Sequence, residues 1–451
     1  MVSAAEQLAQ NMNFSAFGKS KELKQRILFV LGALIIYRLC TYVPLPGIDP
    51  TILQNIFAQL EGQGRSILGV VNLFSGGALS RMSIIALNIM PYISASIIMT
   101  LLTSMSPTLS AMKKEGEAGR KKINQYTRMG TVILTAVQGY TLAVGLESLT
   151  AGAGQSAVID PGLYFRITTV ITLTGGTMFL MWLGEQITAR GIGNGISLII
   201  MSGIVAQLPS ALATTLDLGR TGALSTGLIL GLIVLALGLI YIIVWVERAQ
   251  RRLIVQYPKR QMGNRMAQGD TSHLPIKLNT AGVIPPIFAS SLLFMPATIA
   301  GFSGQGGPEW LGTVTALLGQ GQPLYIAFYV TGVVFFAFFY SGIVFNPDDT
   351  ADNLKQFGGF IPGIRPGERT ADYLRYVLTR LNVIGAAYLS IVCVIPELLI
   401  SRLAVPFYLG GTSLLIVVNV TMDTVAQIHS HMMAHQYEGL IKKARLRGRK
   451  R

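Results

Sequence analysis

Cysteine and charged residues are both scarce in this sequence of 451 residues. The two cysteines, Cys40 and Cys393, lie in separate hydrophobic runs, so they predict neither a disulfide framework nor a metal-binding cluster. Charged residues make up 13% of the chain, about half of their usual share in soluble proteins, while hydrophobic residues make up 51%. This composition excludes an ordinary soluble domain and indicates a membrane protein.

Ionisable residues are nearly absent from the middle of the hydrophobic runs. Arg38, Glu185 and Asp423 lie toward the ends of their runs, where long side chains reach the membrane interface. A proton- or ion-coupled transporter needs ionisable groups near the middle of the bilayer. The sequence therefore disfavours a pump or a symporter and favours a passive pore.

Motifs of catalysis and of metal binding are also missing. The segment "GIGNG" at 191–195 is only faintly like a dinucleotide loop and follows a hydrophobic run, so we interpret it as a turn between two helices. In "HSHMMAH", His431 and His435 share a helical face, but no carboxylate or thiolate completes a metal site. We therefore expect no enzyme activity, no cofactor and no bound metal.

Long hydrophobic runs, by contrast, are abundant. With a window of about 19 residues, hydropathy predicts ten membrane-spanning helices. They cover residues 25–44, 83–104, 127–146, 165–187, 193–210, 222–246, 281–300, 323–345, 375–397 and 404–427. The first span has no cleavage pattern, so we interpret it as retained and not as a signal peptide. The predicted fold is an all-α polytopic membrane protein.

Lysine and arginine cluster in the loops on one side of these spans. The basic segments are 105–126, 247–280, 346–374 and 437–451, whereas 147–164 and 301–322 contain no lysine or arginine. Because basic loops stay in the cytoplasm, both termini are predicted to be cytoplasmic. The net charge of +15 then lies on one face. One interpretation is that this charge only sets the topology and contacts anionic lipids. The other is that it also binds a large partner that is acidic or carries nucleic acid.

Two of the spans repeat one pattern. "NIMPYISASII" at 88–98 and "VIPPIFASSLL" at 283–293 each contain an aliphatic residue, a proline and a trio of small residues. Matching interrupted helices at corresponding positions indicate two halves related by a pseudo-two-fold axis. We therefore divide the chain into a cytoplasmic segment, two halves of five spans and a basic tail, at 1–24, 25–210, 211–436 and 437–451.

Several long motifs carry a family resemblance. They include "LFSGGALSRMSIIALNIMPYISASII", "KKEGEAGRKKINQYTR", "GTMFLMWLGEQITARGIGNGIS", "RRLIVQYPKRQ", "FNPDDTADNLKQFGGFIPGIRPGERT" and "VPFYLGGTSLLIVV". Together they resemble the bacterial SecY family, the pore subunits of the general secretory (Sec) translocon. The resemblance implies a protein-conducting channel in the bacterial cytoplasmic (inner) membrane. Such a channel passes unfolded secretory polypeptides across the membrane and releases transmembrane segments sideways through a lateral gate.

The apolar stretch before the second span is too short to cross a bilayer, which takes about 20 residues of helix. The resemblance implies that this stretch, at 66–79, is a plug helix that closes the pore. The apolar residues of the plug and the glycines of its joint to the second span are Ile67, Leu68, Val70, Val71, Leu73, Phe74, Gly76 and Gly77.

The resemblance also assigns a constriction and a lateral gate. The constriction is a ring of isoleucines at Ile89, Ile93, Ile200, Ile287 and Ile416. Such a ring presents no hydrogen-bonding group to a passing peptide and can exclude ions by dewetting when it is empty. The gate lies between the two repeated segments, at the small residues Ser94, Ala95, Ser96, Ala289, Ser290 and Ser291.

Partners follow from the same resemblance. Lys259 and Arg260 in the first long cytoplasmic loop and Arg365 in the second are expected to dock the SecA motor ATPase and the ribosome, both its RNA and its proteins. SecE-like and SecG-like small membrane subunits, signal peptides, nascent chains and anionic lipids are the other expected partners.

Two alternatives of other classes stay open at this point. One is a secondary transporter for a small solute, built on a 5+5 repeat, although no polar group near the middle of a span is a candidate for its site. The other is a membrane scaffold that transports nothing and recruits ribosomes through its basic loops.

Overall fold

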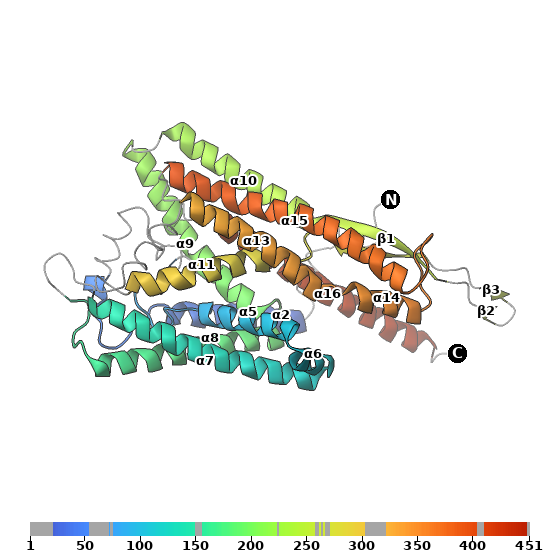
Figure 1. The fold of residues 1–451 in the computed structure, drawn as a ribbon, viewed down its shortest axis with the longest axis horizontal. Helices are drawn as coiled ribbons and strands as arrows, with labels where there is room; N and C mark the ends of the chain where they lie inside the picture. Colours follow the sequence, from blue (N-terminus) through green and yellow to red (C-terminus); the bar gives the residue numbers. More distant parts are fainter. Residues whose placement is uncertain are drawn as a thin grey trace.

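The computed structural model describes residues 21–53, 72, 75–148, 156–222, 225–257, 261–262, 265–266, 271–302, 322–403 and 410–448. These residues form a bundle of long helices with a small β-ribbon at one end (Figure 1). The helices are α2 (Lys21–Cys40), α5 (Met90–Met105), α6 (Pro107–Lys114), α7 (Glu117–Ser148), α8 (Leu163–Arg190), α9 (Gly195–Arg220), α10 (Thr226–Arg248), α11 (Ile284–Phe302), α13 (Pro323–Val344), α14 (Pro347–Gln356), α15 (Glu368–Leu403) and α16 (Gly411–Gly448).

Each of the ten predicted spans overlaps one helix of this bundle, and the all-α polytopic fold is confirmed. Among the described residues, seven helices are long and apolar enough to cross a membrane. An eighth span is counted if α5 and α6, which meet at an angle of 98°, are taken as one broken element. Within the described residues, α2, α11 and α5 taken alone do not meet this criterion, so the count of ten spans stays a prediction.

The second predicted span begins later than hydropathy placed it. The prediction started at residue 83, but residues 75–89 form turns and α5 begins only at Met90. Met82 and Asn88 adopt positive φ angles of 43° and 51°, which a right-handed helix does not accept. A hydropathy window does not register such backbone breaks, because the residues around them remain apolar.

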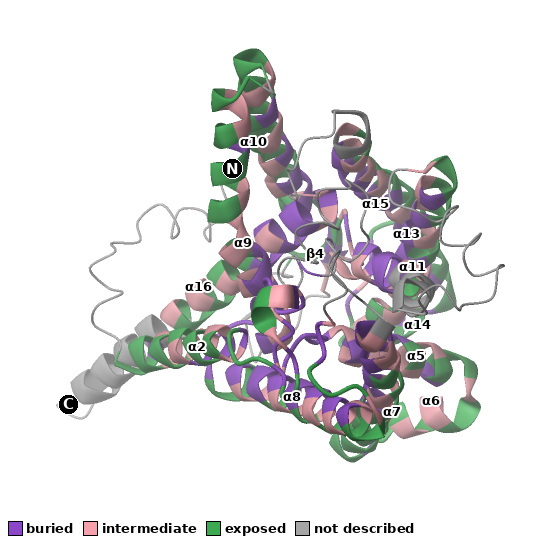
Figure 2. Ribbon diagram, turned by 90° about the vertical axis from the view of Figure 1, so that its left-hand side faces the viewer, coloured by how far each residue is buried: buried purple, intermediate pink, exposed green. Residues whose placement is uncertain are grey.

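The two halves of the chain meet along two seams. On one side, α5 and α7 contact α11, and on the other side α9 contacts α16. Figure 2 shows buried residues gathered in the middle of the bundle, with α8 and α7 along the bottom, α9 and α10 at the left, and α11 and α13 at the right. The largest buried apolar cluster draws its residues from helices on all these sides.

The turn between α8 and α9 brings these two helices together at glycines. The Asn194 side chain caps α9 by accepting hydrogen bonds from the backbone N–H groups of Ile196 and Ser197, at 3.1 and 3.4 Å. A Cβ atom on Gly195 would overlap the carbonyl oxygen of Gly184, so the two backbones touch. The interpretation of 191–195 as a turn between helices is therefore confirmed.

The two long basic loops carry secondary structure that the hydropathy reading did not predict. Strands β1 (Gln250–Gln256) and β4 (Thr271–Lys277) pair as an antiparallel ribbon, and β2 (Gln261–Met262) pairs with β3 (Arg265–Met266) toward its tip. The backbone of Gln256 exchanges two hydrogen bonds of 2.9 Å with that of Phe360 in the second loop. Leu253 and Ile276 of the first loop and Ile361 of the second loop form one buried cluster with residues of α15, namely Leu374, Val377 and Leu378. The two loops therefore form one platform.

A substitution tests the close approach of α8 and α9. Gly195→Ala forces a Cβ against the Gly184 carbonyl and within 2.8 Å of the Ile187 Cβ. Overpacking of this kind costs about 1–3 kcal/mol, so we expect a lower thermal unfolding midpoint in detergent or nanodiscs. Gly231→Ala in α10 is the control, because a Cβ there meets no atom within 4 Å. Equal midpoints for the two variants would contradict the packing described here.

Candidate functional site

The five isoleucines predicted for the constriction come together in the structure. Ile89, Ile93, Ile200, Ile287 and Ile416 line one small cavity, together with Asn88, Met90 and Ser290. They come from α5 and its N-cap, α9, α11 and α16, and therefore from both halves of the chain. All the described residues that line this cavity are uncharged.

The volume of this cavity decides what it can hold. It measures about 10 Å³, which is at the lower limit of the space that one water molecule requires. Ile89 and Ile416 are each only 1% exposed, and Ile93 and Ile200 are each 8% exposed. In this state the apolar side chains close the centre of the bundle to hydrated ions.

Prolines place the ring residues at the starts of two helices. Pro91 lies in the first turn of α5, next to Ile89 at the N-cap. In α11, Pro285 and Pro286 lie in the first turn, beside Ile287. A first-turn backbone nitrogen has no partner within its own helix, so proline costs no hydrogen bond there. The expectation that these prolines interrupt the helices is therefore wrong: they begin them.

The small residues predicted for the lateral gate face different neighbours. A Cβ built on Gly130 of α7 would lie 3.6 Å from the Cβ of Ala95, and one on Gly332 of α13 would lie 3.1 Å from the Cβ of Ala289. Both alanines thus pack against helices of their own half. Ser290 lines the central cavity, and the side chain of Ser291 is buried nearby.

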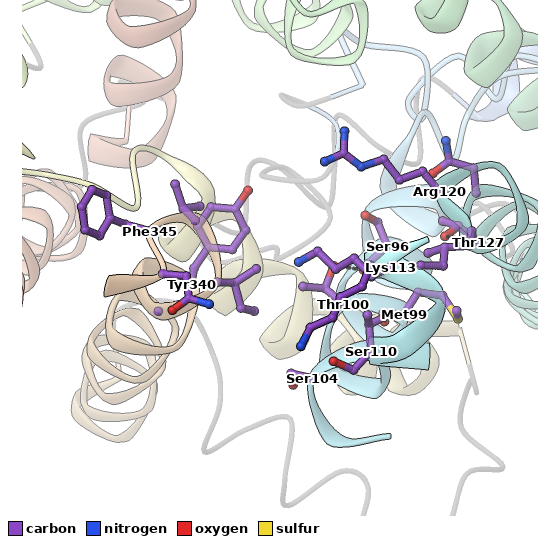
Figure 3. A pocket seen from close by; sticks show the side chains of 18 of the residues that line it. Ser96, Met99, Thr100, Ser104, Ser110, Lys113, Arg120, Thr127, Tyr340 and Phe345 are labelled. Carbon is purple, nitrogen blue, oxygen red and sulfur yellow. Dashed lines mark hydrogen bonds between the residues drawn. The ribbon is translucent and has the colours of Figure 1, made fainter. Parts of the chain in front are cut away.

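Ser96 opens onto a second, larger cavity of about 830 Å³. This cavity lies between α5, α6 and α7 on one side and the end of α13 with the start of α14 on the other. Figure 3 shows Lys113 and Arg120 on the first side and Tyr340 and Phe345 on the second. Ser94 is half-buried on α5 and does not line either of these two cavities.

This larger cavity is not predicted from the sequence, although α5 carries a signal for it. Ser96, Thr100 and Thr103 recur at intervals of four and three residues and line the cavity as one stripe. The hydroxyl of Thr100 donates to the Ser96 carbonyl at 2.7 Å, and that of Thr103 to the Met99 carbonyl at 2.6 Å. The hydroxyls of Thr100 and Thr103 are thus satisfied by their own helix.

The opposite seam, between α9 and α16, is tied by polar contacts. The Gln427 side chain accepts a hydrogen bond from the backbone N–H of Gly193 at 2.8 Å. The Thr421 hydroxyl lies 3.6 Å from the Met201 sulfur. The halves are therefore separated by the larger cavity where α5, α6 and α7 face α13 and α14, and they are joined by side-chain contacts where α9 faces α16.

Most of the predicted plug lies outside the described residues: Ile67, Leu68, Val70, Val71, Leu73 and Phe74. Gly76 and Gly77 are described, are buried, and have φ angles of 66° and 83°. Arg38 donates to the Gly76 carbonyl at 2.7 Å. A Cβ on Gly76 would lie 3.0 Å from the Gly203 Cα of α9. The glycine pair is a tight left-handed turn held between α2 and α9, and its role as a joint stays a prediction.

Of the predicted docking residues, only Arg365 is described, because Lys259 and Arg260 fall outside the described residues. The Arg365 side chain is exposed, and its carbonyl accepts a hydrogen bond of 3.0 Å from the Thr370 hydroxyl. The second loop is also tied to α15 by an ion pair of 3.0 Å between Asp348 and Arg375. The platform thus presents Arg365 on an ordered backbone.

Metal ligands do not gather in the described part of the chain. There, no group of three or more histidine, cysteine, aspartate or glutamate side chains is placed to hold an ion. Charges on neighbouring helices are paired instead: Arg128 with Glu185, and Arg166 with Glu147, each at 2.6 Å. These pairs connect α7 to α8 and line neither of the two cavities described above.

Polar replacement tests the seal formed by the ring. In a variant with Ile93→Asn and Ile416→Asn, each amide stabilises a hydrated constriction by about 1–3 kcal/mol, so we expect the resting conductance to rise roughly tenfold or more. Single-channel recording in planar bilayers measures it. The Ile93→Leu and Ile416→Leu variant is the control, because it keeps the apolar volume. An unchanged conductance in the asparagine variant would count against a central seal.

The SecY family model matches residues 83–425. The protein translocase subunit SecY of Escherichia coli strain K12 is 54% identical over 435 residues, which cover 96% of this chain and 97% of that protein.

Two solved structures share the fold at 18% sequence identity. A structure described as a protein conducting channel matches with a TM-score of 0.61 and covers 91% of this chain and 93% of its own. Sec61 in the canine ribosome-channel complex from the endoplasmic reticulum matches with a TM-score of 0.58 over the same shares of the two chains. At this level of identity the likeness shows the fold alone.

Proposed function

The chain belongs to the SecY family, and we propose that it forms the protein-conducting channel of a bacterial protein translocase. Unfolded secretory polypeptides pass through it across the cytoplasmic membrane, and transmembrane segments leave it sideways. The observation that carries this proposal is the convergence of five isoleucines, from both halves of the chain, on one cavity of about 10 Å³. The chain itself makes and breaks no bond, and a separate motor supplies the energy.

The isoleucine ring acts as the pore constriction. Its apolar side chains exclude water while the channel is empty and offer no hydrogen bond that would trap a passing peptide. A moving peptide displaces side chains that are held only by dispersion contacts, each worth about 0.1–0.2 kcal/mol per atom pair. The seal can therefore open around a peptide and close again behind it.

The plug at 66–79 closes the same path from the outer side. Its end is anchored where the Gly76 and Gly77 turn lies between α2 and α9. Tyr37 adds a second contact from α2, a hydrogen bond of 3.4 Å from its hydroxyl to the Ser75 carbonyl. With a fixed end and a modest apolar area, the plug can swing away without leaving the channel.

The lateral gate lies where α5 and α7 meet α11. Helix α5 separates the two cavities, because Ile89 and Ile93 face the central one while Tyr92 and Ser96 face the larger one. A transmembrane segment that leaves the ring past α5 enters the larger cavity, which is already open in this structure. Its transfer into lipid is then driven by about 25 cal/mol for each Å² of apolar surface removed from water.

The joined platform of the two basic loops is the docking surface for the SecA motor and for the ribosome. Exposed Arg365 suits carboxylates on a motor and phosphates of ribosomal RNA, and Lys259 and Arg260 of the first loop carry the same charge. The ribosome-bound Sec61 structure that shares this fold supports the ribosome as a partner. SecE-like and SecG-like subunits complete the channel, and both termini and this platform face the cytoplasm, near anionic lipids.

Reconstitution tests the proposed function. The chain is placed in proteoliposomes with SecE-like and SecG-like subunits, SecA, ATP and a preprotein. We expect preprotein to become protected from external protease only when the chain and ATP are both present. Liposomes with the partner subunits alone are the control, and equal protection in those liposomes would overturn the proposal.

A charge reversal tests the docking role of Arg365. Reversal of a contact charge costs an interaction and adds a repulsion, so we expect Arg365→Glu to lower motor-driven translocation roughly tenfold. Insertion of a membrane protein by ribosomes should fall less. Arg220→Glu makes the same charge change at the far end of α9 and serves as the control. Normal SecA-stimulated translocation by the Arg365→Glu variant would count against docking at this residue.

A further inference from the structure

A buried carboxylate lies at the base of the β-ribbon. Glu247, in the last turn of α10, is 9% exposed and accepts a hydrogen bond of 2.6 Å from the side-chain amide of Asn279. A buried carboxylate is costly unless partners satisfy it. Asn279, itself 4% exposed, is the partner that offsets this cost.

Asn279 also fixes the start of α11. Its amide donates to the Gly282 carbonyl, and its side-chain oxygen accepts from the Gly282 N–H, both at 3.1 Å. Gly282 has a φ of 64°, which closes this turn just before α11 begins at Ile284. The backbone N–H of Leu278 bonds to the Ala249 carbonyl at 3.0 Å, so the end of β4 is joined to the end of α10 beside the same pair.

The pair lies between the ribbon and the ring. Toward the ribbon, β1 begins at Gln250 and β4 ends at Lys277, so no flexible linker separates either strand from Glu247 or Asn279. Toward the ring, Ile287 lies in the first turn of α11. A displacement of the ribbon can therefore be passed to the start of α11 through the hydrogen-bonded pair of Glu247 and Asn279.

Other groups face the same carboxylate. Asn419 of α16 is 7% exposed, and its side chain acts on the same carboxylate. It lies one helical turn from Ile416 of the ring. Lys277 and Asp423 are the charged groups that also act on Glu247. Glu247 is thus coupled to α16 as well as to the start of α11.

We propose that Glu247 and Asn279 form a positioning joint that transmits load on the ribbon to α11, and so to the ring. The proposal rests on the docking function of the platform. Neither residue lines the central cavity, so both are positioning residues. Their loss is expected to affect the rate of transport and not the binding of the motor.

Reconstituted channel complex with SecA, ATP and preprotein tests the joint. Translocation is measured against the concentration of SecA, which separates the apparent KM for the motor from the maximal rate. We expect Glu247→Ala and Asn279→Ala each to lower the maximal rate about tenfold, with the apparent KM unchanged. We expect Glu247→Gln to keep at least about half of the rate, because its side-chain oxygen still accepts the bond from Asn279. The double alanine variant should be no slower than either single variant.

Two control variants distinguish this proposal from a general effect of removing a carboxylate and from the docking proposal. Glu147→Ala removes a carboxylate from an ion pair with Arg166 elsewhere in the bundle and should leave the maximal rate unchanged. Lys259→Glu with Arg260→Glu should raise the apparent KM if the ribbon docks the motor. If this last variant behaves normally, the docking proposal fails.

The joint itself is overturned by any of three results. One is a Glu247→Ala maximal rate within twofold of the unaltered channel at equal amounts of folded complex. Another is a Glu247→Gln variant as slow as Glu247→Ala. The third is failure of both alanine variants to assemble, which would make the pair an element of stability and not of transmission.

Discussion

The rest of this structure depends on one requirement: the central constriction must be closed and apolar when it is empty, and it must still open for a peptide. Polar side chains at the centre would hold water and bind the translocating polypeptide. Helices that packed continuously through the centre would not open. The structure meets both demands with five isoleucines around a cavity of about 10 Å³. Two of the helices that carry them, α5 and α11, start beside the ring at prolines. Ile89 and Ile287 therefore lie at helix starts, where they can move without unwinding a helix.

The surroundings of the ring differ on its two sides. A cavity of about 830 Å³ separates α5, α6 and α7 from the end of α13 and the start of α14, whereas α9 and α16 are joined by side-chain contacts. The β-ribbon continues into the turn before α11, which places the platform of the two loops and one of the ring helices on one stretch of chain.

Hydropathy and loop charge were sufficient to predict the helices, because a membrane span needs a long apolar run. They were insufficient where backbone geometry or tertiary contacts determine where a helix begins or how a loop folds. The start of α5 depends on the positive φ angles of Met82 and Asn88, and the β-ribbon has polar, exposed strands that no hydropathy window detects. The ring residues came from family resemblance, since a single isoleucine in a membrane helix carries no signal of its own. The bond between Glu247 and Asn279 joins residues 32 positions apart, and neither residue predicts the other.

Cross-linking of an arrested client tests the central claim most directly. A preprotein with one cysteine is halted in channels that lack Cys40 and Cys393 and carry Ile89→Cys, Ile93→Cys, Ile200→Cys, Ile287→Cys or Ile416→Cys in turn. Leu237→Cys on the exposed face of α10 serves as the control. We predict a disulfide to the client at all five ring positions and none at position 237. Disulfides confined to one or two of the five, or formed equally at 237, would show that the client does not pass through the ring.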